Sequence, residues 1–227
     1  MKKFYLTLAA LVGVVAMNAQ EVEPKEAIEG GASPEISELR LAADLVKYGY
    51  AKQNALPLID ALQIIIDTPT QPGATKEQEE AVAVEATEGK QGNVTLDVAE
   101  IVASAKQFAE GDPTMLALLA EVEESAQGAH RGAVGGAKYN VDVVRAGATD
   151  TYNVSFVKGY LAEVALSGDG DTDLDLYVYD ANGNLIASDT DYTDDCYVCW
   201  VPAWTGSYKI KVVNRGRLAN RYVLVTN

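Results

Sequence analysis

The clearest strand pattern in the chain is Asp173-Leu174-Asp175-Leu176-Tyr177-Val178-Tyr179-Asp180, in which leucine or valine occupies every second position. This alternation is typical of a β-strand with one buried face and one exposed face. The next residues, Ala181-Asn182-Gly183-Asn184, contain Asn-Gly, which accepts the positive φ angles of a tight hairpin turn. The pattern therefore predicts a half-buried strand that turns back into an antiparallel sheet.

Similar short patterns lie on both sides of this strand, and glycine-containing turns separate them. Eight strands are expected in all, at residues 141–143, 152–156, 161–166, 174–179, 185–188, 197–201, 207–213 and 221–225. So many short strands in residues 138–227 favour an antiparallel β-sandwich of the jelly-roll type.

The preceding residues, 33–127, have helical periodicity instead. Ser33-Pro34-Glu35 predicts a helix start that the Ser33 side chain caps. Apolar residues then recur at spacings of three and four, which predicts two helical pairs. The expected helices cover residues 36–50, 54–66, 94–105 and 113–122. The pairs are vaguely similar to tetratricopeptide hairpins, which implies a concave protein-binding surface; the alternative is a bundle that buries only its own apolar faces.

Composition divides the rest of the chain. A positive start and a short apolar run at Phe4–Val15 predict a secretory signal peptide over residues 1–19. We expect a disordered N-terminus at 20–32, an acidic linker at about 70–92 and a Gly/Ala linker at 128–137. The prediction is thus an α+β chain in two parts, helical hairpins followed by a β-sandwich, exported to the periplasm or the cell exterior.

The formal net charge is -15, from 33 acidic and 18 basic residues. Such a surface repels nucleic acid and anionic membranes, so we expect neither as a partner, and no membrane span once the signal is removed. The expected partner is an unidentified protein or an extracellular polymer.

Three segments of the C-terminal module together resemble the bacterial pre-peptidase C-terminal domain. They are Asp150–Phe156, Asp173–Asp180 and Trp204–Ile210, and the resemblance covers about residues 139–227. It implies a secreted, jelly-roll-like β-sandwich that is usually non-catalytic and often accompanies a protease. Some members of that family bind calcium or polymers such as collagen.

Acidic residues gather where the module has no basic ones, because no Lys or Arg lies between Lys158 and Lys209. Carboxylates spaced by one residue with intervening glycines suit Ca²⁺. The candidate ligands are Asp169, Asp171, Asp173, Asp175 and Asp191. The alternative is two solvated loops whose charges pair with the later basic residues.

Other motifs leave alternatives open. The pair Cys196 and Cys199 either forms a local disulfide, which requires a bend in the strand, or stays as two thiols, with redox activity a third reading. The aromatic residues either form a platform for a glycan or peptide or fill the core. They are Tyr177, Tyr179, Tyr192, Tyr197, Trp200, Trp204 and Tyr208.

The sequence contains no recognisable catalytic motif, and His130 is the single histidine. We therefore expect a non-enzyme: a secreted accessory or binding module, supported by Ca²⁺. The alternative is a cell-envelope interaction protein whose helical hairpins bind the partner.

Overall fold

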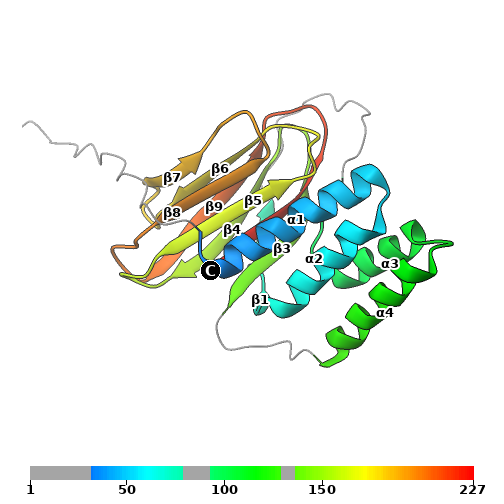
Figure 1. The fold of residues 1–227 in the computed structure, drawn as a ribbon. Coiled ribbons are helices and arrows are strands. Elements are labelled where there is room, and N and C mark those ends of the chain that lie inside the picture. The colour runs from blue at the N-terminus through cyan, green and yellow to red at the C-terminus, as the bar shows by residue number, and fades with distance from the viewer. Residues whose placement is uncertain (1–31, 79–92, 129–135) are drawn as a thin grey trace, which may run out of the picture.

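The structure is a computed structural model, and it describes residues 32–78, 93–128 and 136–227 (Figure 1). The predicted signal peptide, most of the predicted linkers and His130 lie outside these residues. Within them no helix is long and apolar enough to cross a membrane.

The predicted sandwich is confirmed, and each of its expected strands forms. The strands are β3 (Ala137–Val144), β4 (Thr149–Phe156), β5 (Ala162–Gly168), β6 (Leu174–Tyr179), β7 (Leu185–Asp189), β8 (Asp195–Trp200), β9 (Gly206–Asn214) and β10 (Asn220–Thr226). They form two five-stranded sheets with two shorter strands at the edges. Sheet A has the order β1-β3-β10-β5-β8, and sheet B has the order β2-β4-β9-β6-β7.

The two edge strands correct one prediction, because they lie where an acidic linker was expected. β1 (Thr70–Pro72) pairs in parallel with β3, and β2 (Lys76–Gln78) pairs antiparallel with β4. Gly73 lies at the crossing between the sheets, where an added Cβ would clash with Asn140 Oδ1 and the Tyr139 carbonyl oxygen. The start of the linker is therefore fixed to both sheets.

The four predicted helices also form. They are α1 (Pro34–Lys52), α2 (Ala55–Asp67), α3 (Val98–Phe108) and α4 (Pro113–Gly128). Asn54, Asp97 and Asp112 cap α2, α3 and α4 through their side-chain oxygens. The cap predicted at Ser33 is wrong: its hydroxyl caps nothing, and its backbone N–H instead donates to Glu163 Oε1 at 2.8 Å. The start of α1 is held by sheet A.

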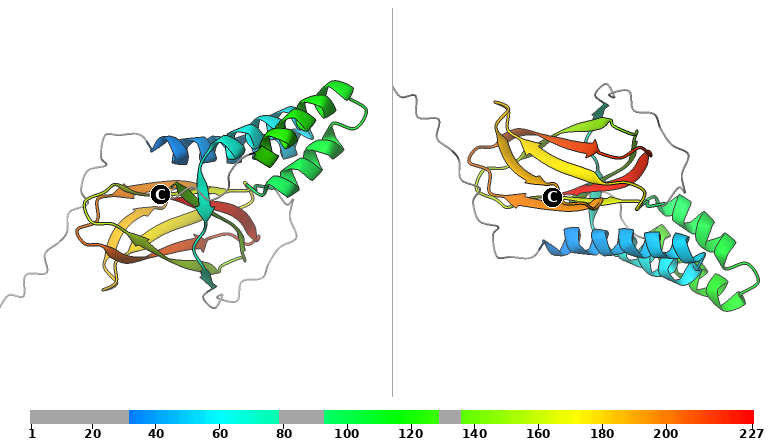
Figure 2. Two further views of the ribbon diagram at one scale, coloured as in Figure 1. Left: turned by 90° about the horizontal axis from the view of Figure 1, so that it is seen from below. Right: turned by 90° about the horizontal axis from the view of Figure 1, so that it is seen from above.

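Helices and sheets form three layers, with sheet A in the middle (Figure 2). Strand alternation sends Leu166, Leu224 and Trp200 into the sandwich and Ala165, Val223 and Val225 toward the helices. The latter residues share one apolar cluster with Leu39 and Leu58 of α1 and α2. The helical part is therefore not an independent unit, and none of the described helices covers the outer face of sheet B.

Candidate binding site

The outer face of sheet B is defined by the residues that alternate with its buried ones. In β9, Tyr208, Ile210 and Val212 point into the sandwich, so Lys209 and Lys211 point outward. In β6, Leu174, Leu176 and Val178 are buried in the sandwich, so Tyr177 and Tyr179 point outward. Registers that pair Tyr179 with Lys209 and Tyr177 with Lys211 place these side chains on one surface.

Aromatic rings on this face are held in place by their neighbours. Tyr177 and Tyr179 stack with ring centroids 6.3 Å apart and planes inclined by 25°. The Lys211 ammonium lies over the Tyr179 ring, 5.9 Å from its centroid. The Tyr177 hydroxyl donates to Asp175 Oδ2 at 3.0 Å and accepts from Arg215 Nη2 at 2.9 Å. These contacts fix both rings before any ligand arrives, which lowers the entropic cost of binding.

A hollow of about 690 Å³ opens beside this pair, within the size range of ligand sites. Besides the Tyr179 ring, its wall contains the small residues Ala181 and Gly183 and polar side chains, those of Asn153, Asp180, Asn182, Ser207, Lys209 and Lys211. It lies at the end of sheet B that carries the β6–β7 turn. The wall therefore combines aromatic surface, hydrogen-bonding groups and two cations.

The β6–β7 turn that borders the hollow is internally braced, as the Asn-Gly pattern predicted. Asp180 Oδ1 accepts from the backbone N–H groups of Asn182 and Asn184, each at 2.8 Å, and Gly183 has a φ of 83°. Burial alone would raise the pKa of Asp180, but these bonds and the Asn184 amide lower it below its ordinary value. The Asp180 carboxylate thus accepts its hydrogen bonds from residues of its own turn.

The remaining aromatic candidates lie elsewhere. Trp200 and Tyr208 pack with Phe156 inside the sandwich, which agrees with the core-filling interpretation. Tyr197 lies on the helical side of sheet A, with the Arg40 guanidinium 5.4 Å from its ring centroid. Tyr192 is 96% exposed in the β7–β8 loop. Trp204 stacks on the Tyr208 ring, with centroids 6.0 Å apart. Of the predicted set, Tyr179 lines the hollow and Tyr177 stacks against it.

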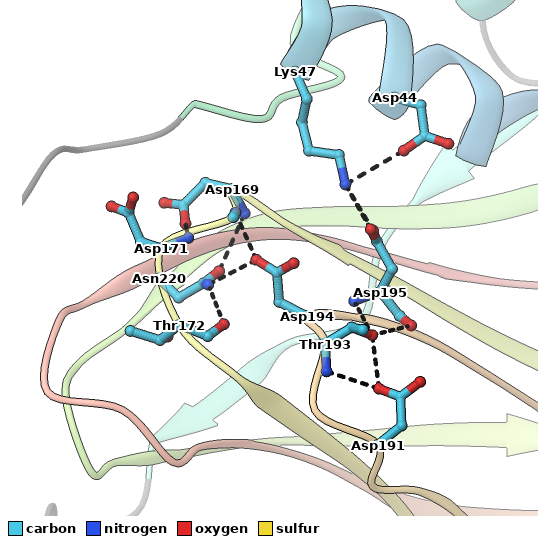
Figure 3. A network of polar contacts seen from close by, with 11 residues as sticks. Asp44, Lys47, Asp169, Asp171, Thr172, Asp191, Thr193, Asp194, Asp195 and Asn220 are labelled. Atoms are coloured by element: carbon cyan, nitrogen blue, oxygen red, sulfur yellow. Dashed lines mark hydrogen bonds and ion pairs between the residues drawn. The ribbon is translucent and has the colours of Figure 1, made fainter. Parts of the chain in front are cut away.

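The predicted calcium ligands lie at the opposite end of the sandwich, and protein donors already bond several of them (Figure 3). Asp169 accepts from the backbone N–H groups of Asp171 at 3.1 Å and Arg221 at 2.8 Å. Asp191 accepts from the Thr193 N–H at 2.8 Å and hydroxyl at 2.7 Å, and these bonds lower its pKa. Asp169 thus joins the β5–β6 loop to β10, and Asp191 braces its own loop.

Of the other predicted ligands, Asp171 lies next to Asp169 (Figure 3). Asp175 forms an ion pair with Arg215 on the outer face of sheet B. Asp173 has a buried Oδ1 without a hydrogen-bond partner, and burial, followed by the charges of Asp175 and Asp191, raises its pKa. Among residues 32–78, 93–128 and 136–227, no three His, Cys, Asp or Glu side chains are grouped to hold a metal ion. Calcium binding stays a prediction.

Two residues that the sequence did not single out organise this acidic end. Asp194 accepts from the Gly170 N–H at 2.6 Å and the Asn220 amide at 2.9 Å, so it joins the β5–β6 and β7–β8 loops to β10. Lys47 of α1 bonds Asp195 at 2.8 Å and Asp44 at 3.3 Å (Figure 3). A helix thus supplies a cation that these loops lack, which sequence spacing could not indicate.

The cysteines are both free, contrary to the disulfide alternative and in agreement with two thiols. β8 pairs with β5 without a bulge from Asp195 to Trp200, so residues three apart point to opposite faces. Cys196 is buried in the sandwich, where its thiol donates to the Leu174 carbonyl and burial raises its pKa. The bend that a disulfide requires is absent from this strand.

Several solved structures match part of the chain, all with low sequence identity and low TM-scores. No protein-family model and no curated protein sequence matches the chain. A mitogen from Yersinia pseudotuberculosis matches with a TM-score of 0.36 and 12% identity, over 41% of this chain and 86% of its own. The pre-peptidase C-terminal domain of a collagenase from Bacillus anthracis matches with a TM-score of 0.32 and 15% identity, over 39% of this chain and 87% of its own.

A periplasmic inhibitor of g-type lysozyme from Aeromonas hydrophila matches with a TM-score of 0.34 and 14% identity, over 43% of this chain and 90% of its own. The solved structures that the sandwich resembles thus include a pre-peptidase C-terminal domain, as predicted, and the N-terminal helical part is unrecognised. The likeness concerns the fold alone.

Proposed function

We propose that the protein is an exported, non-catalytic binding module that holds an extended ligand on the outer face of sheet B. The observation that carries the proposal is the braced pair Tyr177 and Tyr179 beside a polar hollow. Rigid tyrosines on a sheet face offer a large contact area at low conformational cost. The helical layer covers the opposite sheet and serves as support.

Removal of the Tyr179 ring tests this proposal on the full chain. We expect wild-type protein to be retained by at least one immobilised polymer among polygalacturonate, its methyl ester, a mixed-linkage β-glucan and gelatin. Because the ring forms part of the wall of the hollow, Tyr179→Ala should weaken that binding about tenfold. The dissociation constants are to be measured by biolayer interferometry.

The matched control is Tyr192→Ala, which removes a fully solvated ring from the loop at the other end of the sandwich. It should bind like the wild type. Equal affinity of Tyr179→Ala and the wild type, or no retention on any of the four polymers, contradicts the proposal.

The second candidate function places the ligand on the helices. One observation favours it: a groove of about 430 Å³ lies among α2, α3 and α4, and its wall combines apolar residues such as Leu62 and Val102 with the carboxylates of Asp97 and Glu123. In that case Val102→Asp should abolish partner binding while Tyr179→Ala leaves it intact. The braced aromatic pair makes sheet B the stronger candidate.

Calcium as a structural support has its own test. A site filled at a hundred times its dissociation constant adds about 2.7 kcal/mol, which raises the unfolding midpoint by several degrees. Equal midpoints in millimolar CaCl₂ and in chelator would leave Asp169 and Asp191 with a purely structural role in their loops. A rise of several degrees that Asp173→Asn removes would establish the site that the sequence predicted.

A further inference from the structure

We propose that the ligand of the sheet B face is an acidic polysaccharide, a chain of sugar rings that carries carboxylate groups. This inference rests on the proposed function and adds the chemical class of the ligand. It follows from three features of the hollow: its charge, its aromatic wall and its uncharged polar groups.

The central strands of this face carry more cations than carboxylates, whereas the whole chain is acidic. The outward positions of β4, β6 and β9 carry Lys209, Lys211 and a single carboxylate, Asp175. The wall of the hollow adds the Asp180 carboxylate, whose hydrogen bonds come from its own turn. Arg215 neutralises Asp175 through an ion pair. Elsewhere the chain is strongly acidic, with a formal charge of -15. A local pair of cations on such a protein attracts an anionic group at short range and fixes where it sits.

The aromatic wall favours sugar rings over an ordinary acidic peptide. The Tyr179 ring borders the hollow, and apolar C–H faces of sugar rings pack against such aromatic surface. Tyr177 extends the aromatic surface along the same strand, two residues away. The stacked pair therefore offers successive contacts to a polymer that repeats one ring after another.

The uncharged groups match the hydroxyls of a sugar. Asn153, Asn182 and Ser207 line the same hollow and supply amide and hydroxyl donors and acceptors. Lys209 and Lys211 lie two residues apart on β9, so their ammonium groups project from the same face. A sugar ring on Tyr179 could then place its hydroxyls on the amides and its carboxylate on a lysine.

The test compares two polymers that differ only in charge. Full-chain protein is titrated with soluble polygalacturonate and with its fully methyl-esterified form, at low and at moderate NaCl. We expect polygalacturonate to bind at least about tenfold more tightly than the ester, and added salt to weaken its binding. The double variant Lys209→Gln with Lys211→Gln should remove this preference while its thermal midpoint stays near that of the wild type.

The control double variant, Lys52→Gln with Lys106→Gln, makes the same change in net charge on the helical layer. It should keep the preference for the acidic polymer. If the two polymers bind equally and Tyr179→Ala weakens both, the acidic class is wrong and the binding face stands. If poly-glutamate binds and polygalacturonate does not, the ligand is an acidic peptide and the inference is wrong. If Tyr179→Ala changes nothing, the binding face itself is wrong.

Discussion

A Lys76→Met variant is expected to lose about 3 kcal/mol of unfolding free energy, because Lys76 is the cation of a buried carboxylate. Its ammonium lies 3.2 Å from Asp150 Oδ2 and 2.9 Å from Asp142 Oδ1. The Asp150 side chain is fully buried, and its other oxygen has no hydrogen-bond partner. Methionine keeps the length of the side chain and removes the charge. The two carboxylates would then face each other without a cation, with the Tyr152 and Tyr222 hydroxyls as their remaining donors.

The deficit should depend on pH. Burial raises the pKa of Asp150, and the Tyr222 hydroxyl and Lys76 offset part of that rise. Without Lys76 the pKa of Asp150 in the folded chain rises further. A carboxyl with a raised folded pKa contributes stability below its unfolded value, and this stability is lost as pH increases through the folded value. The deficit should therefore be largest at neutral pH and shrink toward about pH 4.

Urea unfolding at the two pH values measures this change. The control is Lys106→Met, which removes an exposed ion pair with Glu123 whose side chains are 53% and 33% exposed. It should alter the unfolding free energy by no more than about 0.5 kcal/mol. If both lysine variants match the wild type at neutral pH, β2 is not anchored as described.

A Leu39→Ala variant should lower the unfolding free energy by about 3 kcal/mol, and it should destabilise the sandwich together with the helices. Leu39 is fully buried in the apolar cluster that α1 shares with Val223 and Val225 of sheet A. Loss of its side chain therefore leaves a cavity in the core that joins the two layers.

Two probes follow the layers separately in one urea titration. Circular dichroism at a helical wavelength follows the helices, and fluorescence follows Trp200 and Trp204, which both lie in the sandwich. We expect one shared midpoint, shifted equally by the variant. Leu41→Ala is the matched control, since Leu41 lies in the same helix but is 52% exposed. A fluorescence midpoint that does not move with the helical one would show that the layers unfold independently.

Sequence periodicity was sufficient for the elements that bury one face. Leu174, Leu176 and Val178 identified β6, and the same alternation placed Tyr177 and Tyr179 on the other face. It did not identify β1 and β2, because Thr70–Pro72 and Lys76–Gln78 carry no alternation and owe their conformation to the strands beside them.

The candidate site could not be identified from the sequence alone, because it depends on contacts between distant segments. Alternation cannot tell which outward face the helices cover, and this is what distinguishes Tyr197 from Tyr179. The cations that pair with Asp195 and Asp150 also come from outside residues 138–227, as Lys47 of α1 and Lys76 of β2 show. Lys76 lies in the segment that was predicted to be a linker, because that segment has no local strand pattern.

The most direct test of the binding face is nuclear magnetic resonance of the full chain with ring-labelled tyrosines, titrated with short oligogalacturonates. The chain has 12 tyrosines, which report from the interior, the helical layer and both ends of the sandwich. We predict that the ring signals of Tyr177 and Tyr179, assigned through Tyr→Phe variants, shift with increasing ligand while that of Tyr192 does not. Shifts confined to Tyr192 or to Tyr48 of α1 would contradict a ligand site on sheet B.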